Sequence, residues 1–260
     1  VASREESAMG LLGRQINHFL FQKGAYAHRS GGVSDVVSLY AQADIAGFWK
    51  KQIACPWVLA VAGDFDRTQV ETFAASLPKA SKPAPASSAP DWNTEHSLTL
   101  NLPGRNQAVY LILFPTAGAD SEDHAALRLL SESLGGFTGM LYQELREKQS
   151  LGYSVFPLDW AARETGFLGF GIIAAPENLD KARAAFKRIV EQLHRELLPD
   201  QTINRAMAVT EAEYYRKRQS RAVRALEAGR NQLDGRPLDN GVVLLEKMKK
   251  VSAEQLRDVA

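Results

Sequence analysis

Hydrophobic residues along the chain recur with two different periods, which together predict both helices and strands. Spacings of three to four residues predict helices over residues 3–22, 41–53, 67–77, 121–134, 139–149, 177–198, 200–229, 239–249 and 253–259. Short apolar runs bounded by turn residues predict strands at Trp57–Ala62, Leu98–Leu102, Ala108–Phe114, Tyr153–Leu158 and Phe167–Ala174. Because strands and helices do not alternate regularly, we expect an α+β fold, with helices packed on one face of a mainly antiparallel sheet.

A segment rich in proline, alanine and serine divides the chain. These three residue types fill 11 of the 14 positions in residues 78–91, and proline, which lacks an N–H and fixes φ, disfavours a helix or a central strand there. We therefore predict a linker over residues 78–96, between the closing part of one domain in residues 1–77 and a nearly complete α+β domain in residues 97–260. The strand predicted at 57–62 has no predicted neighbour in its own part, so we expect it to pair in a dimer or against residues 98–174.

Composition and charge narrow the class of protein. Of 260 residues, 45% are hydrophobic and 23% are charged, which is ordinary globular usage and argues against a disordered, collagen-like or coiled-coil protein. The 31 basic and 30 acidic residues nearly cancel, so we expect neither nucleic acid nor an anionic membrane as a partner. We also expect no membrane span and no signal peptide in this sequence. The one cysteine, Cys55, excludes an internal disulfide and a thiolate zinc site.

Most catalytic signatures are absent from the sequence, including the phosphate-binding loop, the nucleophile elbow and the dinucleotide-binding motif. Gly166, Gly169 and Gly171 fall within a predicted strand, where they indicate a bulge or a close backbone approach. The histidines are at least 10 residues apart, whereas a helical zinc site needs two about four residues apart. Lys217, Arg221 and Arg224 share one predicted helix face, which we expect to be solvated, with binding of an acidic substrate or partner as the alternative.

The most informative stretch is Leu134–Pro157. Two glycines end one predicted helix, the next helix carries Arg146 near its C-terminal end, and Tyr153 opens the following strand. A helix-to-strand corner of this kind can bring Arg146 and Tyr153 together. A structural alternative stays open, because an arginine near a helix C-terminus suits the helix dipole and a tyrosine in a strand usually belongs to the core.

This stretch resembles the C-terminal domain of the pitrilysin/insulinase-type (M16) zinc metallopeptidases and of the related mitochondrial processing peptidases. The matching residues are Leu134-Gly135-Gly136, Leu141, Leu145-Arg146-Glu147-Lys148, Leu151 and Tyr153-Ser154-Val155. Weaker matches follow the family's order at Gly24-Ala25-Tyr26, Ser30-Gly31-Gly32, Trp57–Asp66, Leu100–Gly104, Gln107-Ala108, Gly235-Arg236-Pro237 and Val251–Leu256. The resemblance implies an M16-type domain in residues 97–260, preceded by the end of another M16-like domain in residues 1–77.

In the family, zinc is bound by His-x-x-Glu-His on a catalytic domain, and this sequence contains no such motif. The resemblance therefore implies no cofactor in this chain, zinc on a partner domain, and no catalysis by this chain alone. It also implies a role for Arg146 and Tyr153 in a wall that faces the zinc across a chamber. Arg146 would hold a substrate carbonyl, and the Tyr153 hydroxyl would donate to the developing oxyanion.

The partners that the resemblance implies are a catalytic M16 domain or subunit and a polypeptide substrate, and a homodimer stays open. Two other hypotheses are a structural assembly subunit of the processing-peptidase type, without a substrate, and a zinc-independent peptide-binding module. A His-x-x-Glu-His motif upstream in the parent gene would favour the chamber wall over both. The resemblance is compatible with the bacterial periplasm and with the cytoplasm, and it does not identify the peptide.

Overall fold

The computed structural model describes residues 8–28, 32, 34–83, 90–101, 104, 106–137 and 139–260. The predicted helix start at 3–7, the linker centre at 84–89, Ser30-Gly31 and Leu102-Pro103 lie outside these residues. Internal contacts divide the chain into a larger unit (1–34, 88–210 and 247–260) and a smaller unit (35–87 and 211–246). In the described ranges, no helix is long and apolar enough to cross a membrane.

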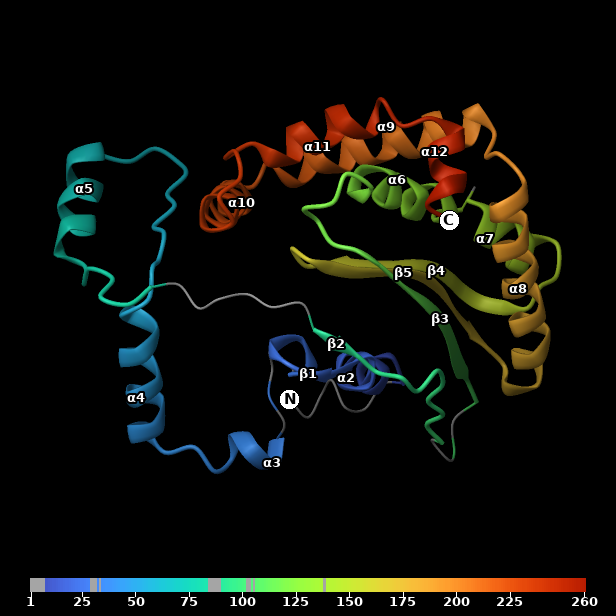
Figure 1. Cartoon of the computed structure of the whole chain (residues 1–260), viewed down its shortest axis with the longest axis horizontal. Helices are drawn as coiled ribbons and strands as arrows, with labels where there is room; N and C mark the ends of the chain where they lie inside the picture. The colour runs from blue at the N-terminus through green and yellow to red at the C-terminus, as the bar shows by residue number, and fades with distance from the viewer. Residues whose placement is uncertain are drawn as a thin grey trace. The chain divides into compact units, whose positions relative to one another are not determined.

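A three-stranded antiparallel sheet lies at the centre of the larger unit (Figure 1). Its spatial order is β3 (Ala108–Ala117), β5 (Thr165–Ala174) and β4 (Gly152–Ala161). The middle strand, β5, is buried along nearly its whole length because it has a neighbour on each side and cover on both faces. The predicted strands Ala108–Phe114, Tyr153–Leu158 and Phe167–Ala174 are thereby confirmed.

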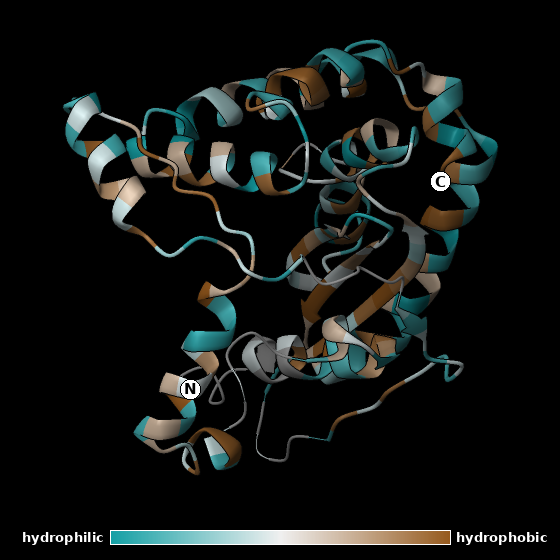
Figure 2. Cartoon of the chain, turned by 60° about the vertical axis from the view of Figure 1, so that its left-hand side comes forward, coloured by the Kyte–Doolittle hydropathy of each residue, from teal (hydrophilic) through white to brown (hydrophobic). Residues whose placement is uncertain are grey.

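Three helices of this unit, named below, pack on one face of the sheet. Phe186 of α8 is fully buried, stacks on Tyr110 of β3 and meets the Phe170 ring of β5 edge-on, with ring centroids 4.8 Å apart in the second pair. In Figure 2 the strands are mostly hydrophobic, whereas the surrounding helices alternate between hydrophobic and hydrophilic residues. The predicted α+β class is confirmed by this arrangement. The helices are α6 (His124–Leu134), α8 (Leu179–Arg195) and α12 (Ala253–Asp258), which contacts the other two.

An aromatic cluster covers part of the opposite face. Side chains alternate along β4, so Asp159 accepts hydrogen bonds from α6 while Trp160 lies against Phe21 and Tyr26, with ring centroids 5.7 and 5.2 Å away. Phe21 starts a short strand and is 1% exposed. The helix predicted over 3–22 is therefore too long at its C-terminal end, because pairing with a strand and aromatic packing override helix propensity there. The elements of this segment are α2 (Ala8–Leu20), β1 (Phe21–Lys23), η1 (Ala25–Ala27) and the partner strand β2 (Asp91–Trp92).

Shorter helical turns connect the sheet to these helices. The predicted helix over 139–149 is a short α-helix, α7 (Met140–Tyr142), followed by a π-helical turn, η2 (Gln143–Glu147). The helix predicted over 177–198 is η3 (Pro176–Asn178) followed by α8. The region from 200 onward begins with α9 (Asp200–Lys217), which runs from the larger unit into the smaller one.

Among its described residues, the smaller unit is entirely helical apart from connecting segments. The single helix predicted over 200–229 is two helices, because the chain turns at Arg218–Ser220 and the Ser220 hydroxyl accepts a hydrogen bond from Val223 N–H. The predicted helices over 41–53 and 67–77 are confirmed. The elements are α3 (Ser34–Val37), α4 (Gln42–Ile53), α5 (Arg67–Ser76), α10 (Arg221–Leu233) and α11 (Asn240–Met248).

Two predicted strands are wrong. Residues 57–62 belong to neither described sheet, so the predicted pairing against residues 98–174 is not formed, and the alternative of pairing in a dimer stays a prediction. The described part of the 98–102 segment is likewise without strand structure. An apolar run becomes a strand only where a neighbour supplies hydrogen-bond partners, and no segment supplies them here among the described residues.

A polar cluster joins the end of α9 to α10 within the smaller unit. The Tyr214 hydroxyl donates to Glu227 Oε1 at 3.0 Å, and Arg218 Nη1 donates to Glu227 Oε2 at 2.6 Å and to the Tyr214 oxygen at 3.0 Å. Arg218 is therefore half-buried and paired. Burial and the Glu227 carboxylate raise the pKa of Tyr214 from 10.0 to about 12.

We expect Tyr214→Phe to lower the free energy of unfolding by about 1 kcal/mol near neutral pH and to have a smaller effect near pH 11. The folded pKa lies above the unfolded one, so the contribution of the neutral hydroxyl is complete below about pH 10 and is lost as the pH rises through about 12. Urea unfolding at both pH values, with the exposed Tyr215→Phe as control, measures this. An effect of equal size at both pH values would contradict the assignment.

Candidate functional site

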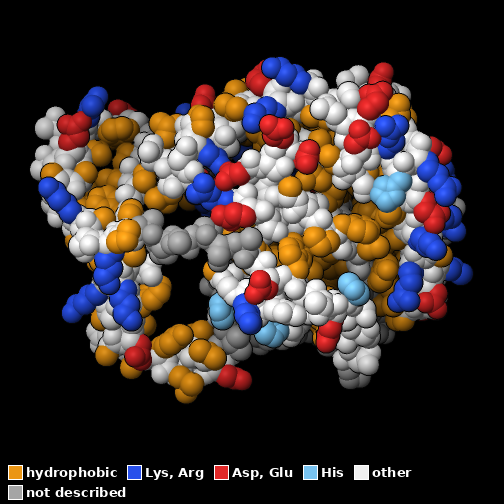
Figure 3. Space-filling model, viewed as in Figure 1, with side chains coloured by type: hydrophobic (Ala, Val, Ile, Leu, Met, Phe, Trp, Pro, Cys, Tyr) orange, Lys and Arg blue, Asp and Glu red, His pale blue; other side chains and the backbone are white. Residues whose placement is uncertain are grey.

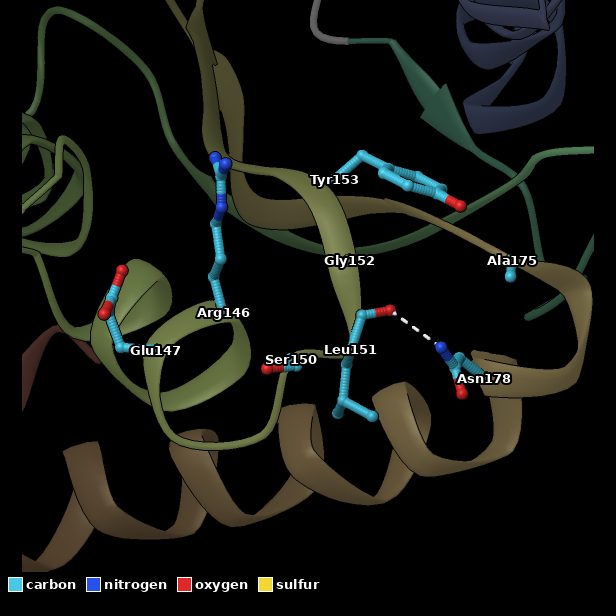
Figure 4. A pocket seen from close by; sticks show the side chains of 8 residues that line it. All are labelled: Arg146, Glu147, Ser150, Leu151, Gly152, Tyr153, Ala175 and Asn178. Carbon is cyan, nitrogen blue, oxygen red and sulfur yellow. Dashed lines mark hydrogen bonds between the residues drawn. The ribbon is translucent and has the colours of Figure 1, made fainter.

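Arg146 and Tyr153 line the same surface pocket, which has a volume of about 450 Å³ (Figure 4). Both side chains are exposed, and Tyr153 is 62% exposed. In Figure 4 they leave the corner in different directions, so that the Tyr153 hydroxyl points away from the Arg146 guanidinium. The structure therefore brings the two predicted residues to one concavity without direct contact. The other lining residues are Glu147, Ser150, Leu151, Gly152, Ala175 and Asn178.

Arg146 lies on the π-helical turn η2 (Gln143–Glu147). Leu145 is fully buried and anchors this turn in the core, so the adjacent Arg146 faces outward. Two backbone hydrogen bonds close the corner: Ser150 N–H donates to Arg146 O at 3.0 Å, and Leu151 N–H donates to Leu145 O at 2.9 Å. π-helical turns are rare and are frequent at functional sites.

Tyr153 lies in a β-bulge at the start of β4. Gly152 is opposite Ala174 and Ser154 is opposite Ile173, so Tyr153 has no counterpart on β5. An extra residue of this kind bends the strand and redirects a side chain, which explains the exposure of the tyrosine. The alternative that Tyr153 belongs to the core, as a tyrosine in a regular strand would, is wrong.

Arg146 makes no ion pair with any residue that the structure describes, neighbouring Glu147 included. The carboxylate of Glu144, on the same helical segment, accepts from Lys148 Nζ at 2.5 Å instead. The guanidinium of Arg146 lies over the Tyr142 ring, 5.2 Å from its centroid. Its hydrogen-bonding groups therefore stay available to a ligand.

Sequence analysis missed two residues that shape this pocket. Asn178 donates from Nδ2 to Leu151 O at 3.2 Å and thereby ties η3 to the corner (Figure 4). Ser150 has φ 49° and is the one non-glycine residue with positive φ in the described part of the chain. Its position between a helix and a Leu-Gly pair was a turn signal, but nothing in the sequence gave the sign of φ.

We expect Ser150→Gly to raise the free energy of unfolding by about 0.5–1 kcal/mol, since the left-handed conformation strains an L-residue by more than glycine loses in chain entropy. Chemical denaturation measures the change. Gly136→Ser is the matched reverse substitution, because Gly136 has φ +74° and open space around it. It should destabilise by a similar amount, and a neutral result for both variants would contradict the strain at this corner.

The corner offers hydrogen-bond donors to a carbonyl or carboxylate group. A guanidinium carries five N–H donors and a phenol carries one O–H donor. Within the described residues, no group of three or more His, Cys, Asp or Glu side chains is placed to hold a metal ion. The donors of Arg146 and Tyr153 are suited to a ligand that carries a carbonyl or carboxylate group.

Comparison with known proteins places this corner in a family. Residues 57–209 match the sequence profile of the M16 peptidase inactive domain. The chain belongs to the M16 peptidase family. A curated relative, an uncharacterized zinc protease of Mycobacterium tuberculosis, is 27% identical to this M16 chain over 173 residues, which are 64% of this chain and 40% of the relative.

Solved structures show the same M16-type fold. A protease from Helicobacter pylori has a TM-score of 0.79 at 16% identity and is matched over 99% of this chain and 65% of its own length. An M16 inactive domain from Pseudomonas fluorescens has a TM-score of 0.79 at 19% identity, over 99% and 63%. A chain of complex III2 from Candida albicans has a TM-score of 0.80 at 14% identity, over 99% and 64%. This M16 chain therefore spans less than two thirds of each of these proteins.

Proposed function

We propose that this M16 chain forms one wall of a proteolytic chamber and binds polypeptide there, while a partner M16 domain or chain holds zinc and carries out the hydrolysis. The observation that carries the proposal is the pocket in which Arg146 and Tyr153 are both exposed. Both residues project from local irregularities of the backbone, a π-helical turn and a β-bulge. Such irregularities are common where a side chain must face a ligand.

Each residue has a distinct role in this proposal. The Arg146 guanidinium donates to a backbone carbonyl of the bound peptide. The Tyr153 hydroxyl donates to the oxyanion that forms when the zinc-bearing partner attacks that peptide. Neither group activates water, so hydrolysis depends on the partner.

A hydrophobic surface on the smaller unit supports a polypeptide partner. Half of the 26 exposed large hydrophobic residues lie between Val36 and Phe73. No side chain of α4 or α5 is buried, and Figure 3 shows hydrophobic side chains at the surface of this part of the chain. Large exposed hydrophobic surfaces are typical of interaction sites. We infer that it packs against further M16 polypeptide, which the longer relatives of this chain contain.

The first test uses the purified chain alone. We expect no stoichiometric zinc and no peptide hydrolysis, because the sequence lacks the His-x-x-Glu-His motif. Elemental analysis and a fluorogenic peptide assay measure both. One zinc per chain, together with activity that a chelator abolishes, would overturn the assignment of hydrolysis to a partner.

The second test measures polypeptide binding directly. Fluorescence anisotropy with labelled, reduced and carboxymethylated lactalbumin, which is permanently unfolded, gives a dissociation constant. We expect Arg146→Ala to raise it about tenfold, the effect of one hydrogen bond from a charged donor. Arg183→Ala is the matched control, because Arg183 is also exposed and lies over an aromatic ring, that of Tyr110, but does not line the pocket. Equal affinities for the wild type and Arg146→Ala would refute the binding role.

The fold likeness to a chain of complex III2 favours a second candidate, a structural assembly subunit without a substrate. The two candidate functions differ in the surface that each requires. In an assembly subunit, Arg146→Ala and Tyr153→Phe would leave function unchanged, whereas charged substitutions of exposed residues on α4, such as Phe48→Glu, would abolish incorporation into the assembly.

A further inference from the structure

We propose that Tyr142 and Phe137 are positioning residues, which hold the Arg146 guanidinium in one orientation without neutralising it. This inference rests on the proposed role of Arg146 in binding polypeptide. It adds two residues that do not line the pocket and whose aromatic rings act through the arginine. The three side chains form one contiguous row that we call the aromatic support: Phe137, Tyr142 and Arg146.

Two successive contacts link the three side chains of the aromatic support, and both involve the Tyr142 ring. The Arg146 Cζ atom lies 5.2 Å from the centroid of the Tyr142 ring, within the range of a cation–π interaction. The Phe137 ring meets Tyr142 edge-on, at 5.3 Å between centroids and an interplanar angle of 85°. Edge-on pairs of this kind are attractive, so each ring limits the movement of the next.

The backbone fixes the two ends of this row. Tyr142 ends α7 and Arg146 follows four residues later on η2, a spacing that places side chains on one helix face. The Gln143 side chain donates from Nε2 to Phe137 O at 3.1 Å, which ties the preceding loop to the helix. A Cβ at Gly139 would lie 2.1 Å from Gly135 O, so the loop between the two helices is tightly folded.

Phe137 is otherwise unexplained. Phe137 is 76% exposed and lies in a loop that also contains Gly135, Gly136 and Gly139. It lies outside the hydrophobic surface of the smaller unit. Core packing does not account for an exposed ring, whereas support of Tyr142 does.

The charges around Arg146 also favour aromatic rings, rather than a carboxylate, as the groups that hold its guanidinium in place. A carboxylate partner would fix Arg146 equally well, but it would occupy the N–H groups that a peptide carbonyl needs. Glu144 is held by Lys148, and Glu147 lines the pocket without pairing to Arg146. A ring face attracts the cation and leaves the N–H groups, which lie in the guanidinium plane, free to donate.

The test is a double-mutant cycle between Tyr142 and Arg146, with the same labelled carboxymethylated lactalbumin as probe. We expect Tyr142→Leu to weaken binding about two- to fivefold, the scale of an exposed cation–π contact. Tyr142→Phe keeps the aromatic ring, so this variant should bind with wild-type affinity. If the hydroxyl rather than the ring were needed, Tyr142→Phe would weaken binding as well. In the Arg146→Ala background, Tyr142→Leu should have no further effect.

Each outcome separates this inference from the proposed function. If Arg146→Ala leaves affinity unchanged, the binding role fails, and the inference that rests on it fails too. If Arg146→Ala weakens binding but Tyr142→Leu does not, only the positioning role is overturned. An effect of Tyr142→Leu that persists undiminished in the Arg146→Ala background would also overturn it, since the ring would then act independently of the arginine.

A second variant and a second measurement cover the case in which Tyr142→Leu does not fold, because Tyr142 is half-buried. Phe137→Ala alters a highly exposed side chain, and it should weaken binding in the same direction, with the effect again absent in the Arg146→Ala background. Nitrogen-15 NMR of the Arg146 side chain should show a ring-current shift of the Nε–H signal that Tyr142→Phe retains. An unshifted signal in the wild type would overturn the proposed contact.

Discussion

Tyr153→Phe is expected to lower the turnover of the reassembled peptidase by about a hundredfold, the scale of losing one oxyanion donor. Because Tyr153 is 62% exposed and lies in a bulge, removal of its hydroxyl leaves no buried group unpaired. Thermal unfolding should therefore be unchanged. The measurement compares the turnover number and the melting temperature of the wild type and the variant, with the zinc-bearing partner present.

Tyr215→Phe serves as the matched control, since it removes another exposed phenolic hydroxyl, from a helix of the smaller unit. It should change neither quantity. A decrease in stability of about 1 kcal/mol or more with unchanged turnover would show that Tyr153 is structural. Loss of turnover in both variants would indicate a general effect on assembly rather than on the oxyanion.

Gly169→Ala is expected to lower the free energy of unfolding by about 3 kcal/mol, at the upper end of the usual cost of overpacking. A Cβ at this position would lie 2.0 Å from Ile112 O, a backbone atom of the neighbouring strand, so relief requires β3 and β5 to separate. Urea denaturation of the chain measures the change.

Gly171→Ala provides the comparison on the same strand and the same face. The Cβ at Gly171 would meet ends of side chains, Leu111 at 2.4 Å and the Phe156 ring at 2.8 Å, which can rotate away. We expect a smaller loss of about 1 kcal/mol. Equal decreases in the free energy of unfolding for the two variants would show that the strands move apart as easily as the side chains rotate. The sequence had predicted a bulge or a close approach at these glycines, and the regular register of β5 selects the close approach.

Local sequence patterns predicted the helices of this protein better than they predicted which segments pair as strands. The spacing of apolar residues predicted α4, α5, α6 and α8 to within a few residues, because a helix satisfies its own hydrogen bonds. The segment at 57–62 has the same apolar character as β5 but lacks a neighbour, and a neighbour cannot be inferred from the segment itself. The break before α10 lies at the turn that Ser220 caps, and the contacts of Tyr214 and Arg218 with Glu227 across this turn form only in three dimensions.

The candidate site was predictable in its residues but not in its geometry. Arg146 and Tyr153 were selected by their place in a helix-to-strand corner and by resemblance, and the structure brings them to one pocket. Their exposure depends on irregularities, a π-helical turn and a bulge, that periodicity does not encode. Their proposed roles in substrate binding stay predictions until the variants are measured.

The extended segment Trp57–Ala62 has a consequence for the cell that makes this protein. Its six residues carry no charge and no proline and are rich in β-branched and aromatic side chains, the signature of a segment that stacks into fibrils. Several of its side chains are solvent-exposed in this chain. Surplus copies, made without enough partner polypeptide, would therefore expose an aggregation-prone window. If the proposed partner covers this segment, synthesis of the two parts in matched amounts is expected to keep the chain soluble.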